Sequence, residues 1–251
     1  MALGSLDYVA VAAAGVAAGA VNAIAGAGSL ITFPTLVAVG LTPLSANVTN
    51  SIGVVPGNLS GTWGFRRELG GQGRRLGLLA TPAALGSILG GVLVLILPPH
   101  TFALVAPVLL GVGAIITLVQ PAISRVVNQS ETRRNAAALI GGVFVVAVYG
   151  GYFGSGIGVL FIALLTIFVA ETLPRLNAFK TVLQALSNGV AGILFAVFAP
   201  VNWWLALTLA VSSAAGGPVG ARLSLLIPAK WLRLVIGVLG LVAAVLLALR
   251  S

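Results

Sequence analysis

The sequence predicts an all-α, polytopic helical membrane protein with two inverted repeats and short broken or re-entrant helices at the midplane of the bilayer. Three observations lead to this fold class. The chain is very apolar, its apolar residues gather into separate runs of helical length, and these runs recur in the same order after 130 residues.

The composition excludes a soluble domain. Hydrophobic residues make up 59% of the chain and charged residues 7%, with a mean hydropathy of +1.15. A soluble domain carries roughly 25% charged residues, which it needs to cover a surface that faces water. The chain has no cysteine, one histidine and four scattered acids, Asp7, Glu68, Glu131 and Glu171. This inventory argues against a disulfide, a metal site, a cofactor and an enzyme, because each needs a ligand set or a nucleophile with a base.

The apolar runs between charged and turn residues define ten segments. They are 8–25, 29–41, 46–65, 76–97, 102–119, 136–153, 157–170, 178–199, 203–227 and 232–249. A membrane span needs about 20 residues, and the segments 29–41 and 157–170 are too short. Each follows a glycine cluster, around Gly26 and Gly28 in the first case and around Gly156 and Gly158 in the second. We therefore predict that these two segments are discontinuous or re-entrant helices.

A shift of 130 residues superposes the first five segments on the last five. The aligned pairs include Gly26 with Gly156, Gly28 with Gly158, Asn47 with Asn177, Asn58 with Asn188, Gly86 with Gly216, Gly90 with Gly220, and Pro98 with Pro228. Paired asparagines and prolines at one shift are hard to obtain by chance in so apolar a chain. We interpret residues 1–121 as a first transmembrane repeat, 122–135 as a cytoplasmic connector and 136–251 as a second repeat.

The net charge of +9 comes from basic residues in a few short loops. The loop 66–75, the connector 120–135 and the turn 228–233 carry Lys or Arg, whereas the loops at 98–101 and 200–202 carry none. The positive-inside rule places the basic loops in the cytoplasm, so corresponding loops of the two repeats lie on opposite sides. An odd number of crossings per repeat, five in this reading, puts both termini outside a cell (cytoplasmic) membrane. The same loops make nucleic acid an improbable partner, which leaves the lipid bilayer.

Polar side chains concentrate in two segments that the shift relates, 45–60 and 177–188. Buried amides and hydroxyls are costly in lipid unless they are paired, so we predict a site that binds a small polar solute. The alternative is that they only pack helices against each other. The candidate substrate-binding residues are Asn47, Thr49, Asn50, Ser51, Asn58, Asn177, Lys180, Thr181, Gln184 and Asn188, with Gly26, Gly28, Gly156 and Gly158 for close backbone approach.

Lys180 is the most informative of these residues. It stands inside an apolar segment in which no carboxylate could pair with it, and Glu171 is nine residues away. An ammonium in that position either reaches back to the membrane interface or contacts an anion. The sequence leaves both interpretations open.

The whole chain resembles the TauE/SafE family of sulfite and organosulfonate exporters, which are membrane permeases. The resemblance lies in Gly26-Ala27-Gly28-Ser29, Thr49-Asn50-Ser51 and Arg66-Arg67, in Gly151 to Gly158 with Asn177 to Thr181, and in Gly216 to Leu223. Ala27, Ser29 and Ile157 interrupt what is often an unbroken glycine run, and Lys180-Thr181 stands where a second Thr-Ser is expected. Because these departures fall in the predicted site, substrate identity is the property that transfers least.

The resemblance implies a secondary transporter that exports a small sulfur-containing anion, sulfite or an organosulfonate such as sulfoacetate. Asp and Glu are missing from the spans, so the membrane potential, worth roughly 2.3 kcal/mol per charge per 100 mV, would have to drive export without a carboxylate relay. Alternatives are a permease or importer for another small anion and a non-transporting membrane partner subunit. The chain could also assemble as a homodimer.

Overall fold

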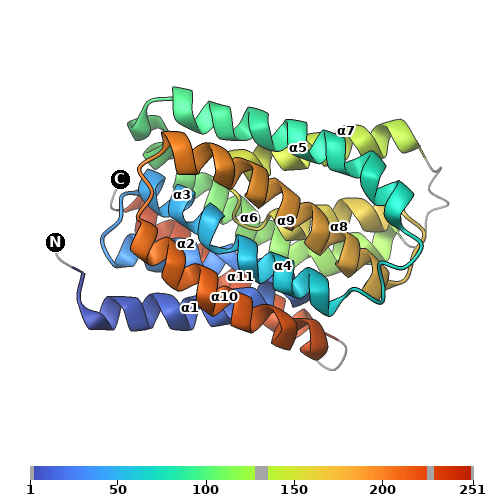
Figure 1. Cartoon of the computed structure of the whole chain (residues 1–251), viewed down its shortest axis with the longest axis horizontal. Helices are drawn as coiled ribbons and strands as arrows, with labels where there is room; N and C mark the ends of the chain where they lie inside the picture. The colour runs from blue at the N-terminus through green and yellow to red at the C-terminus, as the bar shows by residue number, and fades with distance from the viewer. Residues whose placement is uncertain (1–2, 128–134, 225–228, 250–251) are drawn as a thin grey trace.

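The computed structural model describes residues 3–127, 135–224 and 229–249, and the regular structure in these ranges is α-helix (Figure 1). The charged side chains of the connector, Arg125, Glu131, Arg133 and Arg134, lie outside the described part, as does that of Lys230. The predicted all-α class is confirmed.

The helices follow the order of the predicted segments. Those of the first half are α1 (Ser5–Ile24), α2 (Ser29–Ala38), α3 (Pro43–Gly53), α4 (Val55–Gly64), α5 (Gly73–Ile96) and α6 (Pro99–Val127). Those of the second half are α7 (Ala136–Tyr152), α8 (Ile157–Phe168), α9 (Leu173–Phe198), α10 (Trp203–Leu223) and α11 (Ala229–Ala248). Within the described residues, six helices are long and apolar enough to cross a membrane: α1, α5, α6, α9, α10 and α11.

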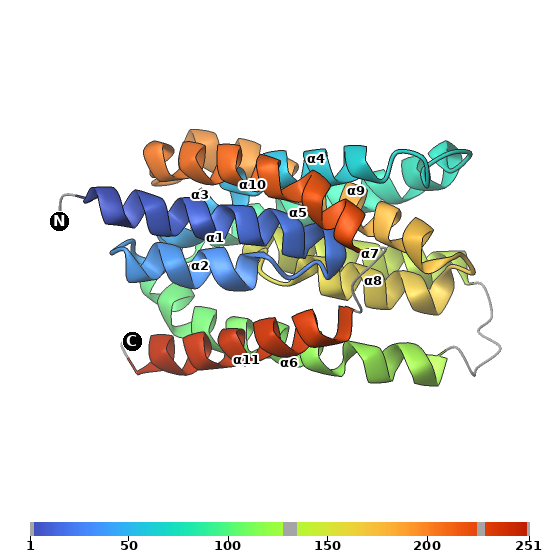
Figure 2. The same cartoon turned by 90° about the horizontal axis from the view of Figure 1, so that it is seen from below.

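The two short segments are short helices, as the sequence predicts. With 10 and 12 residues, α2 and α8 are only about 15 and 18 Å long at 1.5 Å per residue. In both views α2 runs back toward the end of the bundle from which α1 came, and α8 runs back toward the end from which α7 came (Figures 1 and 2). Each short helix therefore forms a hairpin with the helix before it, which agrees with the predicted re-entrant helices and removes two of the five crossings per repeat that were counted from the sequence. Both termini lie at one end of the bundle.

The segment 46–65 differs from the single span that we expected. It forms α3 and α4, which meet at Val54, whose φ of −87° and ψ of −10° remain close to helical values. Pro56 accounts for the interruption, because it has no N–H to donate to the carbonyl of Ile52. The corresponding segment of the second half has no such proline in its interior and forms one helix of 26 residues, α9.

The first helix of each half packs through glycines against a long helix of the other half, α1 against α10 and α7 against α5. A Cβ built on Gly220 of α10 would lie 2.2 Å from the carbonyl oxygen of Ala20 in α1. A Cβ built on Gly90 of α5 would lie 2.0 Å from the carbonyl oxygen of Val148 in α7. Small residues let helix backbones approach each other in a membrane, where packing replaces the hydrophobic effect as the main attraction between helices. These two crossings bind the halves into one bundle.

Two sets of polar contacts close opposite ends of the bundle. The ionic clasp consists of Gln72, Arg75, Glu171 and Arg175; the carboxylate of Glu171 accepts a hydrogen bond from each of the other three at 3.2 Å. The neutral clasp consists of two bonds: Ser45 Oγ donates to the Pro200 carbonyl at 2.8 Å, and the Asn202 amide donates to Thr49 Oγ1 at 3.0 Å. Figure 1 places the α4–α5 turn of the ionic clasp and the α9–α10 turn of the neutral clasp at opposite ends.

Candidate functional site

Two helix breaks meet inside the bundle, and the candidate site is built around them. The first, residues 25–28, joins α1 to α2, and the second, residues 153–156, joins α7 to α8. Every residue of both breaks is buried. Gly26 and Gly156, which the 130-residue shift pairs, both adopt positive φ, at +77° and +76°, a conformation that only glycine adopts at little cost.

The breaks are in direct contact with each other. A Cβ on Gly26 would lie 2.5 Å from the carbonyl carbon of Gly158, and a Cβ on Gly158 would lie 2.5 Å from both Gly26 Cα and Gln184 Oε1. Ser155 Oγ also donates to the carbonyl of Ser29 at 3.5 Å. Two of the four predicted glycines, Gly26 and Gly158, therefore lie where the two breaks are closest, whereas the third, Gly156, faces Gly113 of α6. The fourth, Gly28, packs on the backbone of Ala18.

Lys180 is fully buried and bonds to the end of α1. Its Nζ donates to the carbonyl oxygens of Asn22 and Ala23, both at 2.9 Å, and to Asn177 Oδ1 at 3.3 Å. An ammonium has three donors, so these bonds use all of them. All three acceptors are neutral, and the two carbonyls belong to the negative end of a helix dipole. Lys180 therefore stabilises the broken end of α1, and among the described residues its charge has no anionic partner.

The neighbouring residues of α9 surround the first break. Gln184 Nε2 donates to Asn22 Oδ1 at 3.1 Å, and the same oxygen accepts the Gly28 amide at 2.7 Å. Thr181 turns to its own helix and donates to the Asn177 carbonyl at 2.8 Å. Lys180, Thr181 and Gln184 are at most 1% exposed.

Residues of α3 contact the second break and the start of α2. Asn47 Nδ2 donates to the carbonyl of Tyr152 at 3.0 Å, at the last residue of α7. Asn50 Oδ1 accepts a hydrogen bond from Thr32 of α2. Ser51 Oγ donates to the Asn47 carbonyl at 2.9 Å, within its own helix. Thr49 is also buried, but its hydroxyl accepts the Asn202 amide in the neutral clasp and makes no bond to either break.

Several buried polar atoms at this site have no hydrogen-bond partner among the described residues. Those that can donate are Asn22 Nδ2, Ser29 Oγ, Asn58 Nδ2, Ser187 Oγ and Asn188 Nδ2; those that accept are Asn47 Oδ1, Asn58 Oδ1 and Gln184 Oε1. Leaving one such atom unpaired costs about 1–3 kcal/mol, so these atoms would gain from a ligand or a water that supplies the missing bonds. Buried donors in the same bundle as a buried ammonium have the chemistry that an oxyanion needs.

Asn188 of α9 and Ser51 of α3 both approach the second break. A Cβ on Gly154 would lie 3.6 Å from Asn188 Oδ1 and 3.6 Å from Ser51 Oγ. Asn58, on α4, is completely buried and none of its side-chain polar atoms is paired. The two polar stretches that the sequence singles out thus face the breaks from the two halves of the chain. Asn177 is the one predicted residue that is only half-buried.

The sequence interpretation missed Asn22 and Ser29 as site residues, and it placed Ser187 in the polar stretch 177–188 without choosing it as a candidate. Asn22 links Gly28, Gln184 and Lys180 through its side chain and its carbonyl. The signal was present, since Asn22 is the one amide in the segment 8–25 and a buried amide in lipid needs a reason.

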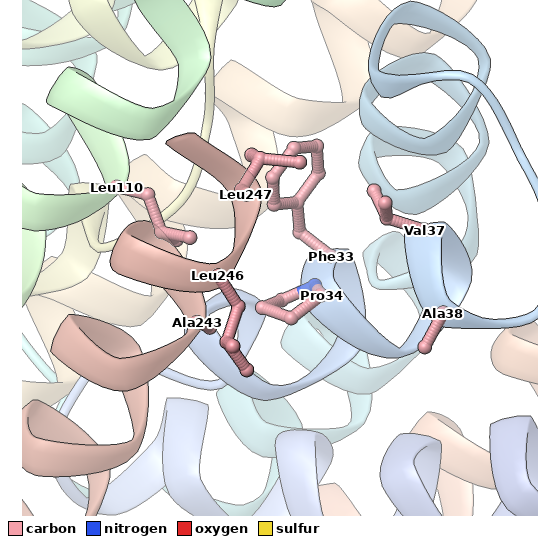
Figure 3. A pocket seen from close by; sticks show the side chains of 8 residues that line it. All are labelled: Phe33, Pro34, Val37, Ala38, Leu110, Ala243, Leu246 and Leu247. Carbon is pink, nitrogen blue, oxygen red and sulfur yellow. The ribbon is translucent and has the colours of Figure 1, made fainter. Parts of the chain in front are cut away.

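An apolar cavity of about 180 Å³ lies elsewhere, between α2, α6 and α11. Its eight lining residues have apolar side chains, with Phe33, Leu110 and Leu247 around its interior (Figure 3). Such a lining suits lipid or another apolar group and gives an anion nothing to bind, so we assign the candidate site to the polar breaks and not to this cavity.

Comparisons with known proteins agree on a membrane transporter. The model of the family described as "Sulfite exporter TauE/SafE" matches residues 11–247. The chain is 28% identical over 225 residues to "Probable membrane transporter protein YfcA" of Escherichia coli (strain K12), covering 89% of this chain and 81% of that protein. It is 26% identical over 212 residues to a "Probable membrane transporter protein" of Haemophilus influenzae, covering 83% and 82% of the two chains.

No solved structure matches the chain. The family match spans nearly all of the sequence, including both breaks and every residue of the candidate site. The protein is therefore a multi-pass membrane protein of the transporter type, and it belongs to the sulfite exporter TauE/SafE family.

Proposed function

We propose that this protein is a secondary transporter that exports a small sulfur-containing anion, sulfite or an organosulfonate such as sulfoacetate, across the cytoplasmic membrane. The observation that carries the proposal is a set of buried donors without a partner among the described residues, on α1, α4 and α9, in the same bundle as the buried ammonium of Lys180. A sulfonate or sulfite group offers several acceptor oxygens and a negative charge, which match these donors and this cation.

The proposal includes a site between two inverted repeats, and the course of the helices supports it. In Figures 1 and 2, α1 and α7 run in opposite directions along the bundle, as do α5 and α10. Gly90 and Gly220 make equivalent close contacts with the first helix of the other half. The shift also relates the two clasps, because it pairs Gln72 with Asn202 and Ser45 with Arg175. Alternating access needs such a pair of opposing gates.

The proposed orientation puts the ionic clasp toward the cytoplasm, since basic loops favour that side. Export then follows the membrane potential, which favours outward movement of an anion by roughly 2.3 kcal/mol per charge per 100 mV. We propose Asn58, Lys180, Gln184 and Asn188 as the main substrate contacts. Lys180, Gln184 and Asn188 lie against the breaks, and Asn58 is buried with its side-chain amide unpaired among the described residues.

The test is a flux assay with purified protein in liposomes, with the potential clamped and no proton gradient. We expect sulfoacetate and sulfite to leave liposomes whose interior is negative, and taurine, a zwitterion, to remain inside. N58L and N188L should slow efflux at least about tenfold, because each removes an unpaired donor worth about 1–3 kcal/mol. T166V is the matched control, since Thr166 Oγ1 bonds only to its own helix, at Ile162.

The proposed function is wrong if no anion moves in this assay, or if N58L and N188L transport like T166V. Movement of taurine at the rate of sulfoacetate would keep a transporter and reject the requirement for net negative charge.

A further inference from the structure

The two helix breaks are held by reciprocal contacts from opposite halves. The last turn of α1 is held by Lys180 of α9, whose Nζ bonds to the Asn22 carbonyl. The end of α7 is held by Asn47 of α3, whose Nδ2 bonds to the Tyr152 carbonyl. The 130-residue shift pairs Asn22 with Tyr152. Each break is therefore fastened to the half to which it does not belong.

The contacts that hold the two breaks differ in charge. Asn47 donates one neutral hydrogen bond, whereas Lys180 donates charge-assisted bonds to two carbonyls and one amide oxygen. A hydrogen bond with one ionised partner is roughly twice as strong as one between neutral groups, and an anionic acceptor adds the attraction between two full charges, which is large away from water. An anion beside Lys180 therefore competes well with the carbonyls for the ammonium, and it has no comparable advantage at Asn47.

A donor for such an anion already lies next to the contact between Lys180 and α1. Asn22 is 1% exposed, and its Nδ2 has no partner among the described residues, while its Oδ1 and its carbonyl oxygen are both engaged. An anion that reaches Lys180 would find this unpaired amide beside it.

We propose that Lys180 is a switch whose ammonium gives up its bonds to the end of α1 and binds the substrate instead. Without substrate its ammonium holds the carbonyls of Asn22 and Ala23 and keeps the first break closed; a bound anion takes the ammonium and frees the α1–α2 hairpin to move. Substrate binding then unlocks the break on one side, while Asn47 continues to hold the other. This inference rests on the proposed function, because it needs an anionic substrate.

The absence of cysteine from the chain permits a direct test. A single probe, S29C, places a thiol on the first residue of α2, where Ser29 is 1% exposed. Because Ser29 lies at the site, binding of sulfoacetate to the S29C protein is first measured by calorimetry. The rate at which a maleimide labels the thiol then reports how often the first break opens.

We expect slow labelling of S29C alone and at least about tenfold faster labelling with saturating sulfoacetate, but not with taurine. S29C/K180M should be labelled fast without any anion and should not respond to sulfoacetate, because methionine fills the same space without donating a bond. S29C/K180R should restore both slow labelling and the response. S29C/T166V is the matched control and should behave like S29C.

Slow labelling of a folded S29C/K180M protein overturns the switch, and so does sulfoacetate that binds S29C without changing the labelling rate. If sulfoacetate neither binds nor is transported, the proposed function fails. Fast labelling of S29C/K180M would in that case still show that Lys180 holds the first break closed. Should K180M not fold, S29C/K180Q replaces it: glutamine keeps a donor without charge, so labelling should stay slow and the response to sulfoacetate should be lost. A wild-type response in K180Q overturns the switch.

Discussion

Gly26 and Gly158 are the residues at which the two helix breaks come closest. Gly26 combines a φ of +77° with a neighbouring backbone that a side chain would strike at 2.5 Å, and Gly158 faces the same gap from the other side. Any side chain at either position would force the breaks apart and displace Gln184 from Asn22. These two glycines therefore set the geometry of the donors around the site.

We expect G26A and G158A to lower the free energy of unfolding by about 2 kcal/mol or more, from overpacking and, at Gly26, from a strained backbone as well. The matched control is G189A on α9, where a Cβ meets nothing within 4 Å and alanine should gain up to about 1 kcal/mol. Unfolding by SDS in mixed micelles measures both. Equal stability of G158A and G189A would contradict the close approach of the breaks.

At this scale the sequence predicted which residues are buried better than it predicted what they touch. Asn58 and Asn188 are buried as expected, because a repeated amide in lipid needs a reason. The partners of Lys180 could not be predicted, since the Asn22 carbonyl lies 158 residues away along the chain and every residue has a backbone carbonyl. The sequence offered an interface or an anion as its partner, and the carbonyl end of a helix was the option that reasoning from side chains alone overlooked.

The helices of the two halves are interlocked by paired glycine crossings, and these crossings supply a test at the scale of elements. Gly90 lets α5 approach α7, and Gly220 lets α10 approach α1. If the halves are related as proposed, the two crossings carry similar energies, because a membrane helix pair gains most of its attraction from close packing.

G90A and G220A should each lower the free energy of unfolding, by about 1–3 kcal/mol for overpacking and by similar amounts. G77A, also on α5, is the control, because a Cβ there has open space. Thermal unfolding of the three variants in one detergent provides the measurement. A loss in one of the first two variants but not in the other would show that the crossings are not equivalent.

Apolar runs and glycine clusters predicted most of the helices, including the shortness of α2 and α8. They did not predict the division of 46–65, because Pro56 gave no clear sign of whether it would bend the helix or interrupt it. Nor could the lengths of the runs distinguish a hairpin from two crossings, since a span and a re-entrant helix have the same apolar composition. That distinction depends on where α2 and α8 end relative to α1 and α7, which only the packed bundle reveals.

The whole molecule is closed at its two ends by contacts of different chemistry. The ionic clasp depends on Glu171, whose partners Arg75 and Gln72 lie more than ninety residues away in sequence. The hydrogen bond from Arg175, followed by that from Gln72, lowers the pKa of the Glu171 carboxyl below its ordinary value of 4.5. The stabilisation is therefore fully present above that ordinary value and is lost as the pH falls through the lowered pKa.

E171Q should unfold at a lower temperature than the wild type at pH 7, because glutamine cannot pair with either arginine. The difference between the two melting temperatures should shrink as the pH falls through the lowered pKa, since a protonated Glu171 resembles glutamine. S45A, in the neutral clasp, is the control and should differ from the wild type by the same amount at every pH. A difference for E171Q that does not depend on pH would exclude an ionised Glu171.

Arg75 and Arg175 make the two ends of the bundle differ in charge. If the two halves are inverted repeats, as proposed, a chain inserted into the bilayer in the opposite orientation would have much the same helix packing. What distinguishes the two insertions is a small group of guanidinium side chains, and two of them also fasten Glu171. Replacing these arginines with neutral residues would weaken the ionic clasp at one end of the bundle. It would also weaken the positive-inside signal that sets the orientation of the protein in the membrane.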